Sequence, residues 1–315
     1  MNAQTSTAER TGELRSLFAR VSRKARVVVP INDAAADPKN TAPAFFCVHS
    51  LSGAGGTDFI ALANRVGDGL RIFGVQAPPK RIDEPMFGAT VPSIAAIYAD
   101  ALSDAQPAGP IHLGGWSAGA PIALEVAHQL RRLGREVGLL VAIEGGPEIA
   151  HDGVRRWDPR YWLRVAANAP AWWRDTRSMK PDFPLGDAIR FARSIGARVR
   201  RGGGRGEGRV RASEHIEQFG SMDRYPAAQR QFMVRLYDAI MQYEPAPWDA
   251  PVVVYEASIK PAATLPQYLE RWRMIAPQAE RVVLDGNHVT IMREPWVGQL
   301  AGDLKRRIGT TEAAA

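Results

Sequence analysis

Cysteine is almost absent from this chain of 315 residues, which contains only Cys47. A single cysteine excludes an internal disulfide framework. Cys47 lies in the apolar run Ala44–Val48, which favours a buried strand position over a catalytic thiol. Long apolar runs are also lacking, since none approaches the roughly 18 residues of a membrane-spanning helix, and the N-terminus does not resemble a signal peptide. We therefore expect a reducing, cytoplasmic setting and no membrane partner.

The most informative motif is G-x-S-x-G at Gly115, Ser117 and Gly119. A short apolar run precedes it, and apolar residues follow at helical spacing until Gly134. Strand, sharp turn and helix are the context of a nucleophile elbow, in which side chains at the flanking positions would collide with the backbone. The motif predicts that Ser117 is a nucleophile. It also predicts that the N–H of Ala118, at the helix N-terminus, faces an oxyanion.

Apolar runs alternate with helical patterns at residues 45–48, 70–75, 110–115, 137–143, 251–255 and 281–284. Such alternation predicts an α/β fold, with a mostly parallel sheet covered by helices on both faces. Functional residues of these sheets gather at the carboxyl ends of strands. Ser117 and Glu144 are both expected at such ends.

The strand pattern stops between residues 150 and 249, where tryptophan becomes frequent. We interpret this segment as a helical lid inserted into a core of residues 25–149 and 250–310. Its aromatic residues are explained most simply as the core of the lid, and alternatively as the lining of a pocket for an apolar substrate chain. Residues 1–24 are expected to form a polar extension, and residues 311–315 a disordered tail.

Positive charge is concentrated in the same insertion. The whole chain has a net charge of +7, yet residues 151–211 contain 15 Lys and Arg against 6 Asp and Glu. The run Arg200–Arg209 is rich in Arg and Gly, as in nucleic-acid tethers, but it lacks interleaved aromatic residues. A solvated hinge explains this run as well, so no nucleic-acid partner is expected.

A glycine-rich loop at residues 49–56 follows the apolar run 45–48 and precedes a helical pattern at 57–65. This order is typical of a phosphate loop, but no Gly-Lys-Ser/Thr follows and the glycines do not fit G-x-G-x-x-G. In a protein with a nucleophile elbow, the equivalent loop supplies a second backbone N–H to the oxyanion. Here we expect that N–H to be the one of Leu51.

A serine nucleophile needs a general base, and His288 has the best position among the 6 histidines. It follows the apolar run 281–284, at the carboxyl end of a predicted core strand. Three acids near strand ends are candidates for orienting its imidazole: Glu144, Glu256 and Asp285. Asp285 is so close to His288 in sequence that the required geometry is difficult. The pattern alone does not choose between Glu144 and Glu256.

Six motifs occur in order from residue 27 onward: Val27–Ile31, Phe45–His49, Phe73–Pro78, Gly114–Gly119, Tyr243–Trp248 and Gly286–Pro295. Together they resemble the thioesterase domains that release products from polyketide and non-ribosomal peptide synthetases, a branch of the α/β-hydrolase superfamily. The resemblance implies the α/β-hydrolase fold. It also implies that the acid follows the strand after the elbow helix, which is the position of Glu144 and not of Glu256.

Two residues depart from the family pattern. The family has Asp where this chain has Glu144, so the carboxylate here carries one additional methylene. The family usually has Pro where this chain has Ser50, beside Leu51 in the predicted oxyanion loop.

The reaction implied by the resemblance is acyl transfer from a phosphopantetheine thioester to Ser117, followed by hydrolysis or cyclisation. No cofactor or metal is expected apart from the phosphopantetheine that presents the substrate. The implied partner is an acyl or peptidyl carrier protein, which is typically acidic and would dock on the basic lid. Two other classes stay open: a carboxylesterase or lipase-like enzyme acting on oxygen esters, and a non-catalytic binding protein on the same fold.

Overall fold

The computed structural model describes residues 27–78, 84, 87–147, 163, 166–167, 170, 225–259 and 268–314. The predicted N-terminal extension at residues 1–24 lies outside them, as do most of the predicted lid at 150–249 and the Arg/Gly run. No helix among the described residues is both long and apolar enough to cross a membrane.

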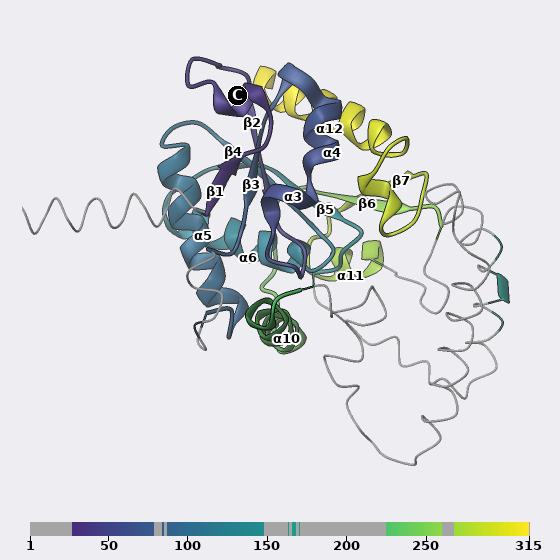
Figure 1. The fold of residues 1–315 in the computed structure, drawn as a ribbon. Coiled ribbons are helices and arrows are strands. Elements are labelled where there is room, and N and C mark those ends of the chain that lie inside the picture. The colour runs from purple at the N-terminus through teal and green to yellow at the C-terminus, as the bar shows by residue number, and fades with distance from the viewer. Residues whose placement is uncertain are drawn as a thin grey trace, which may run out of the picture.

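A seven-stranded sheet in the order β1-β3-β2-β4-β5-β6-β7 forms the centre of the molecule (Figure 1). Only β1 is antiparallel to its neighbour; the other strands pair in parallel. This arrangement confirms the predicted mostly parallel sheet. The strands are β1 Val28–Pro30, β2 Ala44–Val48, β3 Arg71–Val75, β4 Ile111–Trp116, β5 Val137–Ile143, β6 Val252–Ala257 and β7 Glu280–Leu284.

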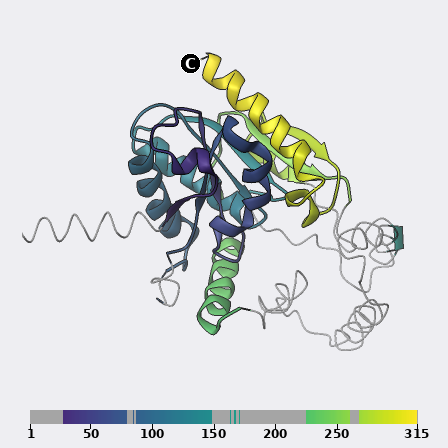
Figure 2. The same ribbon diagram turned by 45° about the horizontal axis from the view of Figure 1, so that its top comes forward.

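Helices cover both faces of the sheet, as the sequence predicts (Figures 1 and 2). On one face, buried residues of α5, α6 and α10 form a continuous apolar cluster with the strands. On the other face, α4 and α12 bury a second cluster. The helices are α2 Asp33–Ala36, α3 Gly55–Asp58, α4 Ile60–Val66, α5 Val91–Ala105, α6 Gly119–Arg132, α10 Ala227–Met241, α11 Tyr268–Ile275 and α12 Val297–Ala314, with the 3₁₀ turns η1 Gly67–Gly69 and η4 Thr290–Met292.

The C-terminus corrects one prediction. Residues 311–314 belong to α12 and not to a disordered tail. The hydroxyls of Thr310 and Thr311 donate to the carbonyls of Arg306 and Arg307, at 2.8 and 3.0 Å, and Ala and Glu favour helix at the positions that follow. These local contacts extend the helix beyond its last buried turn.

Two further details were not apparent from periodicity. The pattern at 57–65 predicts one helix, but the structure has two, α3 and α4, because the buried Phe59 between them has φ −115° and ψ 11°. Helix α11 was not predicted at all, although its Trp272 is fully buried. A short helix with one large apolar residue facing the core has too few repeats for the pattern to show.

Close packing at the N-terminus of α6 predicts a large effect on stability. A Cβ atom on Gly119 would lie 2.6 Å from the carbonyl oxygens of both Val48 and His49, so Gly119→Ala forces backbone atoms apart. We expect this substitution to lower the free energy of unfolding by about 3 kcal/mol. Gly302, inside α12, has no atom within 4 Å of such a Cβ, and Gly302→Ala should raise stability by about 0.5 kcal/mol. Equilibrium urea unfolding checks both values, and equal effects of the two variants would contradict the packing argument.

Candidate active site

Ser117 lies at the sharp turn between β4 and α6. Its φ is +57°, in the left-handed region that serine rarely adopts, so the turn holds a strained backbone. The Ser117 N–H donates to the carbonyl of Ile143 at the end of β5, at 2.8 Å. Helix α6 begins directly afterwards, with Ala118 at its N-cap. The strand, strained turn and helix that the motif predicts are therefore all present.

Glu144 lies one residue beyond the end of β5 and is fully buried. Its φ is also left-handed, at +49°, and its N–H donates to the carbonyl of Tyr255 at 2.8 Å. One carboxylate oxygen accepts from the N–H of Ala257. The other lies 3.3 Å from Nδ1 of His288. The strained turn and the bond from β6 together aim this long side chain at the imidazole.

His288 lies in the loop after β7, and its side chain is 13% exposed. The side chain of Asn287 accepts from the N–H groups of Val289 and Thr290, which closes the loop into a tight turn. The indole N–H of Trp116 donates to the carbonyl of His288 at 3.0 Å. This bond joins the loop to the residue that precedes Ser117. Because Nδ1 faces Glu144, the other ring nitrogen, Nε2, is on the opposite edge of the imidazole.

The other two candidate acids have different partners. Glu256, at the end of β6, is buried and forms an ion pair with Arg281 at 2.9 Å, and it also accepts from the N–H of Leu269 at 3.1 Å. Asp285 is exposed and accepts from the side chain of Gln299 at 2.8 Å. Of the three acids, the structure places the carboxylate of Glu144 on His288.

The loop after β2 lies against the elbow. The close approach of the Val48 and His49 carbonyls to Gly119 shows that the end of β2 touches the first residue of α6. The N–H of Gly53 donates to the carbonyl of Ser50 at 3.2 Å, which makes a turn with Leu51 in its first half. Leu51 and Ala118, the two predicted oxyanion donors, therefore belong to adjoining segments at the carboxyl end of the sheet.

His49 is a buried neutral histidine behind this loop. Its Nδ1 lies 2.5 Å from the Ser50 carbonyl and its Nε2 lies 2.6 Å from the Tyr98 hydroxyl. A carbonyl only accepts, so Nδ1 carries the proton and Nε2 accepts from Tyr98. Burial lowers the pKa of His49 from 6.5 to about 4, and the bond to Ser50 offsets part of this effect.

The lowered pKa of His49 predicts an acid-sensitive fold. Between pH 6.5 and 4 the unfolded chain binds a proton that the folded chain does not, so stability falls as the pH falls through this window and is constant above it. The full effect is about 3 kcal/mol. Urea unfolding at about pH 7, 5.5 and 4.5 should show this slope in the wild type and a shallower slope in His49→Gln. Identical slopes in the two proteins would contradict the assignment.

Several contacts that support the site could not be predicted from the sequence. The indole N–H of Trp272, on α11, donates to the carbonyl of Gly145 at 2.9 Å and so holds the turn that carries Glu144. Trp116 also packs on His288, with ring centroids 5.7 Å apart. The partners are separated by 127 and 172 residues in sequence, and no local spacing links them. Cys47, by contrast, is buried in β2 as predicted, and burial raises the pKa of its thiol.

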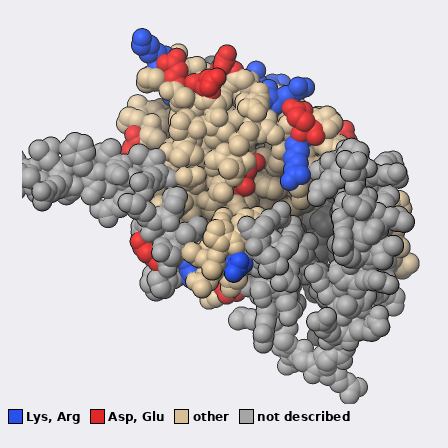
Figure 3. All heavy atoms as spheres, in the orientation of Figure 1, with Lys and Arg blue, Asp and Glu red and all other residues tan. Residues whose placement is uncertain are grey.

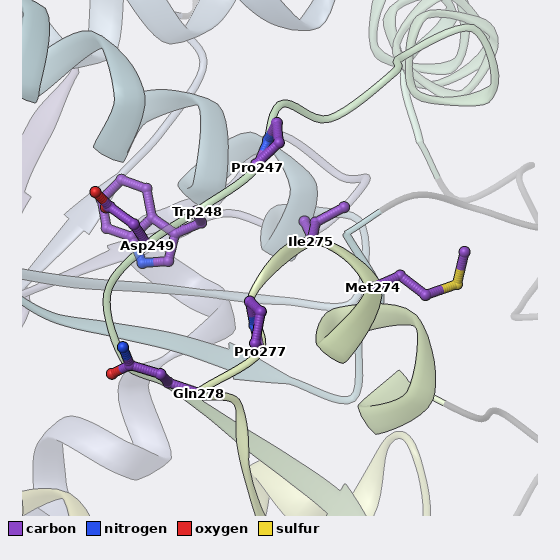
Figure 4. A pocket seen from close by; sticks show the side chains of 7 residues that line it. All are labelled: Pro247, Trp248, Asp249, Met274, Ile275, Pro277 and Gln278. Carbon is purple, nitrogen blue, oxygen red and sulfur yellow. The ribbon is translucent and has the colours of Figure 1, made fainter.

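A hollow of about 340 Å³ lies at the other end of the sheet (Figure 4). Trp248 and Asp249 come from the segment that leads into β6, and Pro277 and Gln278 from the segment that leads into β7. These segments are at the amino ends of their strands, so the hollow is not part of the site around Ser117. Among the described residues, no three His, Cys, Asp or Glu side chains are grouped so that they could hold a metal ion.

Comparison with known proteins shows what the segment around Ser117 is similar to. Residues 43–164, which include Ser117 and Glu144, match the family model described as Thioesterase domain. The match covers 122 of the 315 residues, so it shows a likeness of this segment to that family. Among curated proteins, the chain is 36% identical over 107 residues to a dimodular nonribosomal peptide synthase of Bacillus subtilis. It is 40% identical over 77 residues to a non-reducing polyketide synthase of Aspergillus terreus. These alignments cover 33% and 23% of the chain, and 4% of each relative.

Solved structures extend the likeness over the whole fold. The chain aligns with the NocB thioesterase domain in covalent complex with a fluorophosphonate nocardicin G analogue at a TM-score of 0.57 and 21% identity, covering 90% of this chain and 99% of the other. The RedJ thioesterase from the prodiginine pathway of Streptomyces coelicolor gives a TM-score of 0.56 at 22% identity, covering 86% and 92%. The predicted α/β-hydrolase fold is thereby confirmed.

Proposed function

We propose that this protein is a thioesterase that releases an acyl, polyketide or peptidyl chain from a phosphopantetheine carrier through an acyl-serine. The observation that carries the proposal is the contact between Glu144 and His288 at 3.3 Å, beside a serine in a strained elbow. A buried acid on an imidazole holds one tautomer and stabilises the imidazolium that forms when serine is deprotonated. The thioesterase-domain match and the synthetase relatives support the choice of substrate.

In the first half of the reaction, Nε2 of His288 takes the proton from the Ser117 hydroxyl as Oγ bonds to the thioester carbonyl carbon. The N–H groups of Leu51 and Ala118 stabilise the oxyanion. The intermediate then collapses, the C–S bond breaks, and the phosphopantetheine thiolate leaves with the proton from His288. The carboxylate of Glu144 stabilises the charged imidazolium.

In the second half, water or a nucleophile on the acyl chain attacks the acyl-serine. His288 accepts the proton of the attacking group and returns it to Oγ of Ser117 as the ester bond breaks. Water yields a carboxylic acid, whereas an internal hydroxyl or amine yields a ring. The only non-protein group in this scheme is the phosphopantetheine of the substrate. We place the reaction in the cytoplasm, with the carrier protein.

Brief incubation with a panel of acyl-pantetheine thioesters, followed by intact-mass spectrometry, tests the proposal. The expected result is a mass increase equal to the acyl group, together with release of the acid or ring. Matched oxygen esters serve as the control, because a carboxylesterase would process them as fast as the thioesters. Absence of both adduct and product, with free thioesters and with carrier-bound ones, would overturn the proposal and favour a non-catalytic role.

The proposed partner is an acidic acyl or peptidyl carrier protein that docks on the basic insertion. On the face drawn in Figure 3, basic and acidic side chains of the described residues are interspersed along the upper rim, and the centre is mainly uncharged. This face therefore has no strong basic patch within the described residues. The excess of Lys and Arg at residues 151–211 is the stronger electrostatic attraction for an acidic carrier and its phosphate.

Charge reversal in the insertion tests this docking. The triple variant Arg200→Glu, Arg201→Glu and Arg205→Glu should lower kcat/KM for a carrier-bound substrate by roughly 10-fold at low salt. Turnover of a small acyl-pantetheine thioester should be unchanged, because it does not need the carrier surface. Added salt should lower the wild-type rate toward that of the variant. Equal slowing of both substrates would contradict carrier docking on these residues.

A further inference from the structure

The loop that carries Leu51 has no regular secondary structure, so its shape depends on side-chain contacts. We call residues 50–53 the oxyanion loop. The carbonyl of Ser50 accepts from Gly53 at 3.2 Å and from the imidazole of His49 at 2.5 Å. In a trans peptide, a carbonyl and the following N–H point in opposite directions. Because His49 and Gly53 hold the Ser50 carbonyl, the Leu51 N–H points away from these two residues.

One carboxylate contacts this loop on both sides of Leu51. Asp58, the last residue of α3, accepts from the N–H of Ser50 at 2.9 Å. The hydroxyl of Ser52 lies 3.4 and 3.5 Å from its two oxygens, and the hydroxyl of Ser50 donates to that of Ser52 at 3.2 Å. The carboxylate thus fixes the residue before Leu51 by its backbone and the residue after it by its side chain.

Asp58 is itself held against the sheet. A Cβ on Gly74, near the carboxyl end of β3, would lie 2.8 Å from the carbonyl carbon and oxygen of Gly55, so the start of α3 touches the strand directly. The N–H of Asp58 donates to Ala54 at 3.2 Å, which closes the single turn of α3. Movement of Asp58 relative to β2 and β3 would break this packing. The sheet therefore provides a rigid base for the contacts to the loop.

Helix α10 contacts the loop from the other side. The side chain of Gln229 donates to the carbonyl of Ser52 at 2.8 Å. The ring of Phe232 packs closely on Gly53: a Cβ atom added to Gly53 would lie only 2.8 Å from it. These contacts and those of Asp58 enclose the loop between α10 and α3.

We propose that Asp58 is a positioning residue that orients the Leu51 N–H for oxyanion binding. The inference rests on the proposed thioesterase function. Ser50 makes this role possible, because the proline usual at this place in the family has no N–H to donate. Burial raises the pKa of Asp58, and its hydrogen bonds with Ser50 and Ser52 offset part of that effect, so the loop stabilises the charged carboxylate.

Two substitutions of Asp58 separate positioning from folding. Asp58→Asn keeps the shape and one acceptor oxygen but loses the charge, and should lower kcat roughly 10-fold with KM changed less than about 2-fold. Asp58→Ala removes both acceptors and should lower kcat roughly 100-fold. Asp68→Asn is the matched control, because Asp68 is an exposed acid in η1, and it should leave kcat unchanged.

Two readouts distinguish positioning from a structural role. The first is inhibition by a trifluoromethyl ketone analogue of the acyl-pantetheine substrate, whose adduct with Ser117 bears an oxyanion; its inhibition constant should rise by the same factor by which kcat falls. The second is amide hydrogen exchange, which should be faster at residues 50–53 in Asp58→Asn while β2 and α6 stay protected. A purely structural role would instead lower the melting temperature and speed exchange throughout.

Each outcome has a distinct meaning. Lower kcat, weaker inhibition and locally faster exchange in Asp58→Asn would establish the role. Wild-type kcat and inhibition in that variant would overturn it and leave the proposed function intact. A wild-type protein without turnover would refute the proposed function and the catalytic part of this inference together. Hydrogen exchange would then still decide whether Asp58 holds the loop, and unchanged exchange would remove that claim as well.

Discussion

Ser117→Ala is expected to lower kcat/KM for an acyl-pantetheine thioester by about 10⁵-fold and to abolish the acyl-enzyme adduct. The oxyanion donors and the base cannot replace a missing nucleophile, so the remaining rate comes from water and from binding alone. Ser117 lies at φ +57°, a conformation that alanine also avoids, so stability should change little between the two. The backbone bond from residue 117 to Ile143 is retained in the variant.

Steady-state assays with the free thioester measure kcat/KM, and intact-mass spectrometry measures the acyl-enzyme adduct. Ser103→Ala is a suitable control, because Ser103 is on α5, and it should form the adduct at the wild-type rate. Substantial turnover by Ser117→Ala would show that another residue is the nucleophile. Loss of activity together with a large drop in melting temperature would instead indicate misfolding of the elbow.

Glu144→Gln should lower kcat by about 10³-fold with little change in KM. Glutamine fills the same volume, but it is neutral and cannot stabilise the imidazolium of His288. The amide also no longer selects the tautomer that has its proton on Nδ1. Because Glu144 is fully buried, water cannot take over the role of the carboxylate.

Glu256→Gln provides the matched comparison, because it is a buried glutamate near the end of the neighbouring strand. Its partner is Arg281 at 2.9 Å, so its loss should lower the melting temperature and leave kcat within about 3-fold of the wild type. Measuring kcat, KM and melting temperature for both variants separates the two roles. The assignment of the acid would be wrong if Glu256→Gln lost activity and Glu144→Gln retained it.

Much of the core could be predicted from local sequence. Runs such as 137–143 and 251–255 are continuously apolar because their strands are covered on both faces. Glycine is required at 115 by the close approach of α6 and at 119 by the end of β2. Short elements were harder: α11 has a single fully buried residue, and the break at Phe59 depends on one buried ring. The helical end of α12 was missed because alanine-rich termini resemble disordered tails in composition.

The candidate site also has features that local sequence predicts and features that depend on long-range contacts. The sequence by itself determined that Ser117 follows a strand and begins a helix, and that His288 follows another strand, because glycine spacing and apolar periodicity are local properties. Only the tertiary structure shows which acid contacts His288, because apolar periodicity leaves three acids near strand ends. The folded chain brings the carboxylate of Glu144 to 3.3 Å from the imidazole, although Glu256 is on the strand next to β7. The contacts of Asp58 and Gln229 with the oxyanion loop likewise depend on packing between α3, β3 and α10. Such contacts join residues far apart in the chain, and no spacing pattern encodes them.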